Sequence, residues 1–438
     1  MPLDEKDSLV TTTTRTQLPT YAAFRDLLAG TPPTTTQLKE HFAPTFDAIA
    51  QGTKEREKDR ELGFEAVELL RESGFTRAHL PWADGGLHCS IEQLIDLYID
   101  LGTADSNLAQ GLHSHFLFTQ IVANRDHGPI TRWILDETAA GKIFGNAIVE
   151  LPPATGYRKT TVEQNNELNG DKFYTTGALF SDHLLVSAHN PVDETQLLYA
   201  VPANHSGVRR VDDWNGFGQR LTASGSTLFH DVPVHPDRSL SIATPSGMLG
   251  YPFVWLMLAA TQVGIGIAAL RDITAYVQGR RRTYAHATAE TPAQDPLVHH
   301  VAGEVSAKVH TARYIALGAA QELQAAFDAV RSEDSLDSEI FRQAHTAANL
   351  AVTRATIVIS EQIIAATNQI FETGGASAVT AEKQLHQHWL NARVIGSQSP
   401  LIYRIRMIGD YHLNGVIPPL VTSVRDSAPQ NDNAAEGA

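Results

Sequence analysis

The spacing of apolar residues changes twice along the chain. Over residues 37–143 apolar residues recur at helical intervals. In the segment KEREKDRELGFEAVELLRESG the apolar stripe consists of Leu62, Ala66, Leu69 and Leu70. Gly74 ends that segment, as is typical of a helix C-terminal cap. The pattern therefore predicts a helical region over residues 37–143.

Short segments with the alternation and turn residues of β-strands fill residues 144–242. NNELNGD has the composition of a hairpin turn, and the strands around it include GNAIVEL, DHLLVSAHN, TQLLYAVPA and STLFHDVPV. Long helical patterns return in residues 243–425. Because helices and strands are segregated, and because no GxGxxG or GxxxxGK[ST] motif follows a strand, a doubly wound nucleotide-binding fold is disfavoured.

Both ends of the chain carry few apolar residues. Thr- and Pro-rich sequence fills much of the first 36 residues, and the last dozen are small and polar. The length of 438 residues exceeds one compact core. We expect a flexible N-terminal segment (1–36), an N-terminal helical domain (37–143), a central β-sheet domain (144–242), a C-terminal helical bundle (243–425) and a flexible tail (426–438).

Composition and charge narrow the class of protein. The formal net charge of -15 is spread along the chain, which argues against a nucleic-acid interface. The longest apolar run, YPFVWLMLAATQVGIGIAAL, contains Thr261, Gln262 and two glycines, so we expect a buried helix and no membrane span. The N-terminus lacks the apolar core of a signal peptide. The single cysteine, Cys89, fits a reducing cytoplasm, and no residues have the spacing of a metal site.

The strand KFYTTGALFSDHLLVSA is interrupted in its middle. Phe173 and Tyr174 suit a pleated surface, but Thr175, Thr176 and Gly177 follow before the aliphatic pattern resumes. A flavin ring requires an apolar wall together with hydroxyl or backbone partners, and this stretch offers both. The alternative is a threonine pair in an edge strand that ends in a glycine bulge.

Three further motifs are candidates for a binding site. The arginines at 280–282 close a long helix, where cations meet the helix dipole, but three in a row also suit a phosphate. FETGGASA has paired glycines that either stop a helix or let the backbone approach a ligand. His113 and His115 are two apart on a helix and point to different sides, so we expect at most one to face a given pocket.

Several blocks, in this order, resemble the acyl-CoA dehydrogenase superfamily, and most closely its monooxygenase branch, which includes the dibenzothiophene and dimethylsulfone monooxygenases. The blocks lie between about residue 69 and residue 415 and are LPWADGG, SNLAQGLHSHFLF, KFYTTGALFSD, WNGFGQRLTASGSTLFHDVPV, QVGIGIAAL, RRRTYAHA, QDPLVHHVAGEVSAKVHTAR, FETGGASA and NARVIGSQSPLIYRIRMIGDYHLNG. The resemblance implies an α+β fold, with an N-terminal helical domain, a central antiparallel β domain and a C-terminal helical bundle.

The resemblance also implies an activity. The expected enzyme is a cytoplasmic homotetramer that uses O2 and reduced FMN, or FAD, supplied by a separate flavin reductase. It would oxygenate a small, largely apolar substrate through a flavin C4a-hydroperoxide, and an organosulfur compound is the best candidate. The two alternatives are an FAD-dependent acyl-CoA dehydrogenase and a catalytically silent paralogue that binds flavin.

Site residues carry over from the resemblance one by one. Thr175 would support the oxygenated flavin, and His115 is favoured over His113 at the substrate. The cofactor contacts implied are Phe173, Tyr174, Thr175, Thr176, Arg282, Gln369, Gly374 and Gly375.

Two departures from the family pattern bear on the chemistry. Residues 392–404 contain no carboxylate, whereas many acyl-CoA dehydrogenases carry their catalytic base there and others carry it on an earlier helix. Where many monooxygenase relatives have a histidine, this chain has Gln398, which cannot carry a proton at neutral pH. Either the proton role has passed to His115 or a neighbour, or the oxygen acceptor is a soft nucleophile that needs no base. The catalytic candidates are therefore Thr175, His115 and Gln398.

Overall fold

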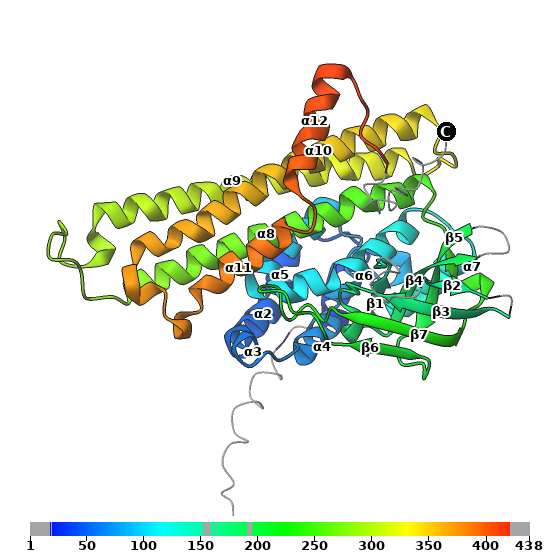
Figure 1. Ribbon diagram of the computed structural model, residues 1–438, viewed down its shortest axis with the longest axis horizontal. Coiled ribbons are helices and arrows are strands. Elements are labelled where there is room, and N and C mark those ends of the chain that lie inside the picture. Colours follow the sequence, from blue (N-terminus) through cyan, green and yellow to red (C-terminus); the bar gives the residue numbers. More distant parts are fainter. Residues whose placement is uncertain (1–17, 19, 152–158, 164, 191–194, 421–438) are drawn as a thin grey trace, which may run out of the picture.

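The computed structural model describes residues 18, 20–151, 159–163, 165–190 and 195–420. A helical part, a sheet and a second helical part follow one another, and Figure 1 shows the sheet packed at one end of a long bundle. The α+β fold class is therefore as predicted. The helices before the sheet are α1 (Tyr21–Leu28), α2 (Thr35–Gln51), α3 (Thr53–Asp59), α4 (Phe64–Glu72), α5 (Ile91–Ala104), α6 (Ser106–Asn124) and α7 (Pro129–Ala139).

Two local features of this helical part differ from the sequence prediction. Part of the expected N-terminal tail is the helix α1, which buries Tyr21, Phe24 and Leu28 and is therefore part of the core. The expected continuous helix ending at Gly74 is divided into α3 and α4, because Arg60 adopts a left-handed φ of 53° at the end of α3. Residues 1–17 and 19 of the predicted N-terminal tail and residues 426–438 of the predicted C-terminal tail lie outside the described residues.

The sheet is mixed, whereas the prediction was antiparallel. Within the described part of the chain its strand order is β6-β7-β3-β2-β4-β5-β8, and β1 also pairs with β4. Two of its strand pairs, β1–β4 and β2–β4, are parallel. The predicted hairpin joins β2 to β3, with Asn166 at φ 61° in its turn. The strands are β1 (Phe144–Ala147), β2 (Thr161–Val162), β3 (Glu167–Lys172), β4 (His183–Asn190), β5 (Thr195–Pro202), β6 (Val208–Val211), β7 (Ser226–Pro233) and β8 (Ser239–Leu240).

The second helical part is built around one central helix. Its members are α8 (Pro245–Gln278), α9 (Pro296–Ala329), α10 (Glu339–Gln369), α11 (Leu385–Gly396) and α12 (Leu401–Asn414). The helix α8 packs against α5, α6, α9, α10 and α11. By length and composition alone, two described helices could cross a membrane; the more apolar one is α8, and 78% of its tested window is buried inside the fold. The apolar run is thus a core helix, as expected.

A close helix crossing fixes α8 against the first helical part. A Cβ on Gly264 would lie 2.5 Å from the backbone carbon of Gly102 on α5, so no side chain fits at that position. The QVGIGIAAL block therefore places its glycine where two helix backbones touch. This contact sets how closely α8 packs on α5.

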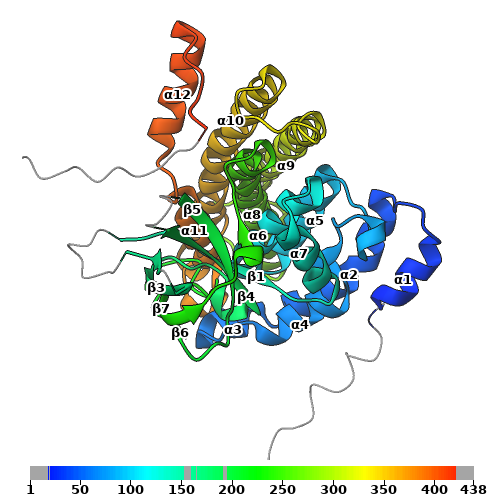
Figure 2. The ribbon, with the colours of Figure 1, turned by 90° about the vertical axis from the view of Figure 1, so that its right-hand side faces the viewer.

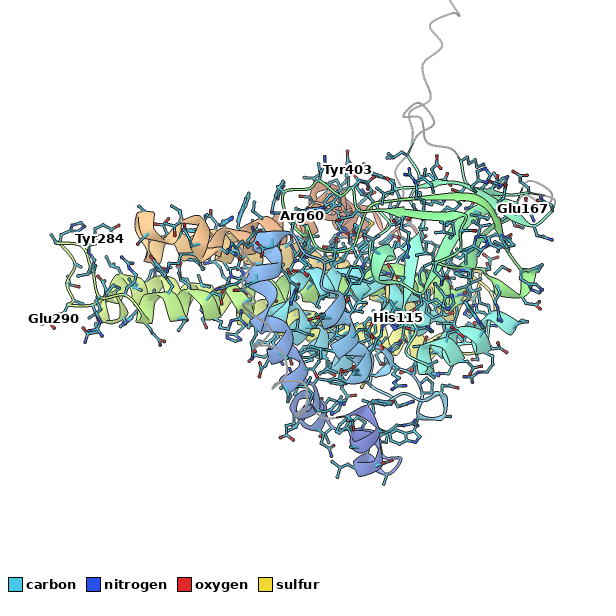
Figure 3. All side chains as sticks on the ribbon, turned by 90° about the horizontal axis from the view of Figure 1, so that it is seen from below. Arg60, His115, Glu167, Tyr284, Glu290 and Tyr403 are labelled. Atoms are coloured by element: carbon cyan, nitrogen blue, oxygen red, sulfur yellow. The ribbon has the colours of Figure 1, made fainter. Side chains whose placement is uncertain are left out.

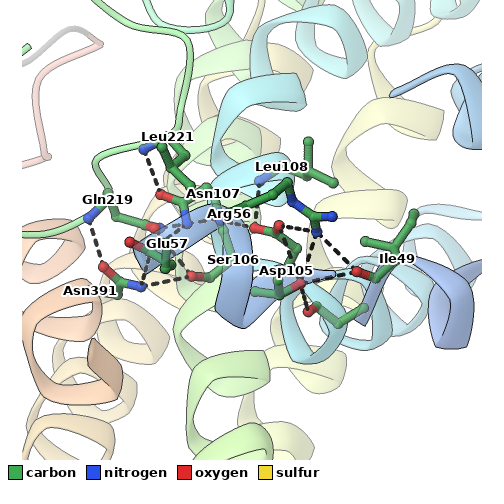
Figure 4. A network of polar contacts seen from close by, with 12 residues as sticks. Ile49, Arg56, Glu57, Asp105, Ser106, Asn107, Leu108, Gln219, Leu221 and Asn391 are labelled. Atoms are coloured by element: carbon green, nitrogen blue, oxygen red, sulfur yellow. Dashed lines mark hydrogen bonds and ion pairs between the residues drawn. The ribbon is translucent and has the colours of Figure 1, made fainter. Parts of the chain in front are cut away.

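A buried hydrogen-bond network joins the three parts of the fold at one point (Figure 4). Asn107, at the start of α6, donates to Glu57 on α3 (2.8 Å) and accepts from the backbone N–H of Leu221 (3.0 Å). Asn391 on α11 accepts from the backbone N–H of Gln219 (2.7 Å). The side chains of Glu57, Asn107, Gln219 and Asn391 are all buried. The loop before β7 is thus held from both helical parts.

We expect Asn107→Ala to lower the free energy of unfolding by roughly 2–3 kcal/mol, because it leaves the Leu221 N–H without its buried partner and leaves Glu57 Oε1 only the longer bond from Asn391 (3.4 Å). Asn414→Ala is the matched control: Asn414 is exposed and bonds only to Asp410 one turn away, so the change should stay within about 0.5 kcal/mol. Urea unfolding measures both. Equal losses in the two variants would contradict the structural role of the network.

Candidate active site

A cavity of about 630 Å³ lies where the sheet, α6, α8 and the α11–α12 loop meet. Its lining residues come from all three parts of the fold, including the segment that follows β3. The polar lining residues are Gln110, His113, Ser114, Asn146, Thr176, Thr222, Ser224, Ser397 and Gln398. The apolar and aromatic ones include Leu117, Phe118, Ile121, Ile148, Val149, Tyr174, Trp214, Phe217, Tyr251, Val254 and Trp255.

The segment after β3 turns toward this cavity because its backbone leaves the extended conformation. β3 ends at Lys172, and Tyr174 has a left-handed φ of 53°, which is costly for an aromatic residue and marks a position held by its surroundings. Gly177 has φ 77°, and a Cβ there would lie 2.0 Å from the carbonyl oxygen of Gly111 on α6. The interruption in the sequence is thus the point where this segment packs directly onto the α6 backbone.

The two threonines of this segment point in different directions. The Thr175 hydroxyl is buried, donates to the Gly225 carbonyl (2.8 Å) and lies 2.8 Å from the Thr227 hydroxyl. Thr176 lines the cavity, and its hydroxyl accepts from Ser224 (3.1 Å). Tyr174 also lines the cavity, whereas Phe173 does not. Within one subunit the hydroxyl that can meet a ligand is therefore Thr176 and not Thr175.

The two histidines of α6 also face different ways, as their spacing predicted. The one that lines the cavity is His113, whereas the sequence favoured His115. His115 is fully buried outside the cavity lining; its Nε2 donates to the Thr76 carbonyl (2.6 Å) and its Nδ1 accepts from the Phe144 N–H (3.3 Å). Both ring nitrogens are thus occupied in the neutral form. Burial lowers the pKa of His115 to about 4. This geometry gives His115 a structural role.

His113 lines the cavity, and its protonation pattern follows from its contacts. Its Nδ1 lies 2.5 Å from the Gln110 carbonyl oxygen, which can only accept, so Nδ1 carries the hydrogen. Nε2 is then the basic atom, and the Ser114 hydroxyl, 3.3 Å away, donates to it. Asn146 on β1 donates in turn to Ser114. Burial lowers the pKa of His113, so the ring is neutral near pH 7.

The loop that departs from the family pattern faces the same cavity. Ser397 and Gln398 line it together with Tyr174 and Thr176. The structure therefore brings together the interrupted strand and the loop after α11, which are more than two hundred residues apart in the sequence.

The remaining candidates lie elsewhere, at the end of the bundle that is far from the sheet. Figure 3 shows Tyr284 and Glu290 of the α8–α9 loop at one end of the molecule and Glu167 of β3 at the other. Arg282 is exposed in this loop. The loop contacts the FETGGASA turn, since a Cβ on Gly375 would lie 2.2 Å from the Tyr284 hydroxyl and since Arg280 donates to the Thr373 carbonyl (2.9 Å).

Gln369 and Gly374 belong to the same end of the bundle. Gln369 accepts from Lys308 (2.8 Å) and donates to Glu304, so both ends of its amide are used inside the bundle. A Cβ on Gly374 would lie 2.5 Å from that of Ala378, which accounts for this glycine by packing. Arg282, Gln369, Gly374 and Gly375 thus form one group, and none of them lines the cavity of its own subunit.

Several lining residues were missed from the sequence. Gln110 is buried on α6, lines the cavity, and has no hydrogen-bond partner for its Oε1 within the described part of the chain. Asn146, Trp214 and Ser224 come from a strand and a loop whose roles the sequence did not reveal. The WNGFGQRLTASGS block was recognised, but its pocket-facing residues depend on the left-handed turns at Gln219 and Ala223, which periodicity cannot predict.

Comparisons with known proteins agree with this architecture. Residues 256–399 match the C-terminal domain of acyl-CoA dehydrogenases. The probable FMNH2-dependent monooxygenase SfnC of Pseudomonas putida is 28% identical over 363 residues, covering 80% of this chain and 88% of that protein. A dibenzothiophene monooxygenase of Mycolicibacterium goodii is 28% identical over 383 residues, covering 83% and 90%.

Solved structures extend the likeness to the fold. The methanesulfinate monooxygenase MsuC from Pseudomonas fluorescens superposes with a TM-score of 0.77 at 25% identity, and the match covers 86% of this chain and 97% of that one. The predicted resemblance and the predicted acyl-CoA dehydrogenase-like fold are both confirmed.

The threonine pair allows a matched test of the local geometry. Thr175→Val should lower the free energy of unfolding by roughly 1–3 kcal/mol, because it removes a buried hydroxyl that bonds to Gly225 and Thr227. Thr176→Val, beside the cavity, should change it by less than about 0.5 kcal/mol. Chemical denaturation of both variants measures the difference. A larger loss for Thr176→Val would show that the two side chains are exchanged.

The lowered pKa of His115 predicts how the free energy of unfolding depends on pH. Its folded-state pKa of about 4 lies below the unfolded value of about 6.5, so between these values the unfolded chain binds more protons and stability falls as the pH falls. His115→Gln should reduce this slope by up to about 1.4 kcal/mol per pH unit, whereas His300→Gln, at an exposed position, should not. Denaturant unfolding at several pH values between 6.5 and 4 measures the slopes. An unchanged slope in His115→Gln would refute the assignment.

Proposed function

We propose that this chain, which is similar over most of its length to the FMNH2-dependent monooxygenases and has the acyl-CoA dehydrogenase fold, is the oxygenase of a two-component flavin-dependent monooxygenase. A separate reductase supplies reduced FMN. One atom of O2 enters a small, largely apolar organosulfur substrate, and the other leaves as water with the two electrons of the flavin. The observation that carries the proposal is the cavity that Tyr174, Thr176, Ser397 and Gln398 all line.

The residues around the cavity fit a flavin ring. Tyr174 and Trp214 offer aromatic surface, while Thr176, Ser224 and Asn146 offer hydroxyl and amide groups along one wall. Bound there, reduced FMN would supply the electrons that activate O2. The apolar lining excludes water from the reacting atoms. On this geometry Thr176 takes the contact that sequence resemblance gave to Thr175, and Thr175 holds the wall behind it.

His113 is the residue that we assign to proton handling, in place of His115. It lines the cavity, its ring is neutral near pH 7, and its Nε2, which accepts from the Ser114 hydroxyl, is the ring atom that can take up a proton while Nδ1 stays bonded to the Gln110 carbonyl. Ser114 and Asn146 extend this contact as a chain of hydrogen bonds. Gln398, on the α11–α12 loop, is then left to orient the substrate by hydrogen bonds alone.

The cavity disfavours the rival acyl-CoA dehydrogenase activity. Removal of the α proton of an acyl thioester requires a carboxylate or similarly strong base at the substrate. No aspartate or glutamate lines the cavity within the described residues. A catalytically silent paralogue differs from our proposal only in turnover, which the experiment below measures.

The group at the far end of the bundle supports an oligomeric enzyme. Arg282 and Gly375 cannot meet the cavity of their own subunit, so we assign them to the cofactor of a neighbouring subunit in a homotetramer. Figure 2 shows α12 standing away from the bundle, and its Ile402, Tyr403 and Leu413 are 68%, 62% and 84% exposed, as expected of a helix that packs on another copy. Light scattering should give the mass of four chains.

The central test follows the reaction of reduced FMN with oxygen. Purified protein is mixed with photoreduced FMN and then with oxygenated buffer containing methyl phenyl sulfide, and absorbance is followed in a stopped-flow instrument. We expect a transient absorbing species distinct from reduced and oxidised FMN, followed by formation of the sulfoxide. Reduced FAD and protein-free FMN serve as controls. Failure to form either the transient or the product with both flavins would refute the proposal.

Variants of the same reaction test the residue assignments. His113→Gln should lower turnover by 10²-fold or more, because glutamine can bond but cannot accept a proton. Adding Gln398→His to that variant should restore part of the rate if only the proton acceptor is missing. Reduction of protein-bound FAD by an acyl-CoA, in place of oxygenation, would instead identify a dehydrogenase.

A further inference from the structure

Among the residues that the structure describes, no side chain with a full charge lines the cavity. Its described lining residues include no aspartate, glutamate, lysine or arginine. Burial lowers the pKa of His113 and raises that of Tyr251, so both are neutral near pH 7. Any ligand in this space is therefore stabilised by apolar contact and by dipoles, and not by an ion pair.

Three buried or half-buried cations that do not line the cavity are committed to other partners. Lys172 is buried and bonds to Glu150 (2.6 Å). The Arg404 guanidinium stacks 3.9 Å over the Trp255 ring, and Trp255 separates it from the cavity. Arg210 donates to the carbonyl of Ala178 (2.8 Å). None of these three lines the cavity, so none can neutralise an anion inside it.

The polar end of the cavity presents acceptors. The Nε2 atom of His113 is an acceptor, because Nδ1 holds the ring hydrogen, and it accepts from the Ser114 hydroxyl (3.3 Å). Gln110 Oε1 is a second buried acceptor, with no partner in the described part of the chain. These groups offer dipoles but no positive charge, so an uncharged ligand is tolerated better than an anionic oxygen.

From this charge distribution we infer that the substrate is an uncharged organosulfur compound with a broad, preferably aromatic, apolar body, and that sulfinates and sulfonates of the same size are excluded. The inference rests on the proposed function and adds the charge of the substrate to it. The relatives differ on this point, since one is described as a dibenzothiophene monooxygenase and another as a methanesulfinate monooxygenase. The cavity of this chain suits the first type of compound.

Size and shape agree with that choice. The flavin ring would take part of the cavity of about 630 Å³, and Phe217, Tyr251 and Trp255, which are not assigned to the flavin, also line it with flat rings. Flat aromatic compounds stack on such surfaces. An anion would instead lose its hydration without a counter-charge, which costs several kcal/mol.

A matched pair of ligands tests the inference. Methyl phenyl sulfoxide and benzenesulfinate have the same ring and each accept one oxygen atom, giving the sulfone and the sulfonate, but only the second is charged. Calorimetry with the FMN-saturated full-length protein measures binding, and the oxygenation reaction measures kcat/KM. We expect benzenesulfinate to be at least about 100-fold poorer in both, equivalent to about 2.7 kcal/mol. Equal or better binding and turnover of benzenesulfinate would overturn the inference.

A change at the cavity mouth separates charge from shape. Gln398→Lys places a cation on the α11–α12 loop, and Gln398→Met is the uncharged control of similar length. Benzenesulfinate should bind at least about tenfold more tightly to the lysine variant than to the methionine variant; equal affinities would count against the inference. If the neutral sulfoxide binds preferentially but no compound is oxygenated, the charge inference stands and the proposed function fails.

Discussion

The buried amide of Asn107 is the contact on which the arrangement of the molecule depends. It bonds to Glu57 on one side and to the backbone of Leu221 on the other, so the first helical part and the loop before β7 cannot move apart without leaving buried polar groups unpaired. Asn391 links the second helical part to the same loop, because it accepts a hydrogen bond from the backbone N–H of Gln219. Since the loop residues Thr222 and Ser224 line the cavity, this network also fixes the wall of the site.

A second constraint positions the opposite part of that wall. Gly177 packs so closely on Gly111 that the segment after β3 and α6 behave as one unit. The residues that face the cavity from this unit, Tyr174, Thr176 and His113, therefore keep a fixed relation to one another. A pocket built in this way is largely preformed, because its shape is set by backbone contacts and buried hydrogen bonds rather than by exposed side chains.

The sequence predicted the order of helices and sheet because amphipathic spacing is a local property that tertiary packing then uses. It also identified Tyr174, Thr176 and Gln398, which do meet in the cavity. It could not decide between Thr175 and Thr176, or between His115 and His113, since that choice depends on the left-handed turn at Tyr174 and on which carbonyl each imidazole meets. The parallel pairing of β1 and β2 with β4 was missed for the same reason: strand direction is set by connections between distant segments.

The chemistry needed for FMN is divided between two distant places on the chain. The cavity can take an uncharged ring but has no cation for a phosphate, whereas the α8–α9 loop carries exposed arginines but has no cavity beside it among the described residues. FMN combines a largely apolar ring with an anionic phosphate, so neither place alone satisfies it. Figure 3 places Tyr284 and Glu290 of that loop at one end of the molecule, away from His115, and in the proposed tetramer a second subunit would unite the two places. On this view the arginines serve the phosphate, and the cavity keeps a charge-free interior for an apolar substrate.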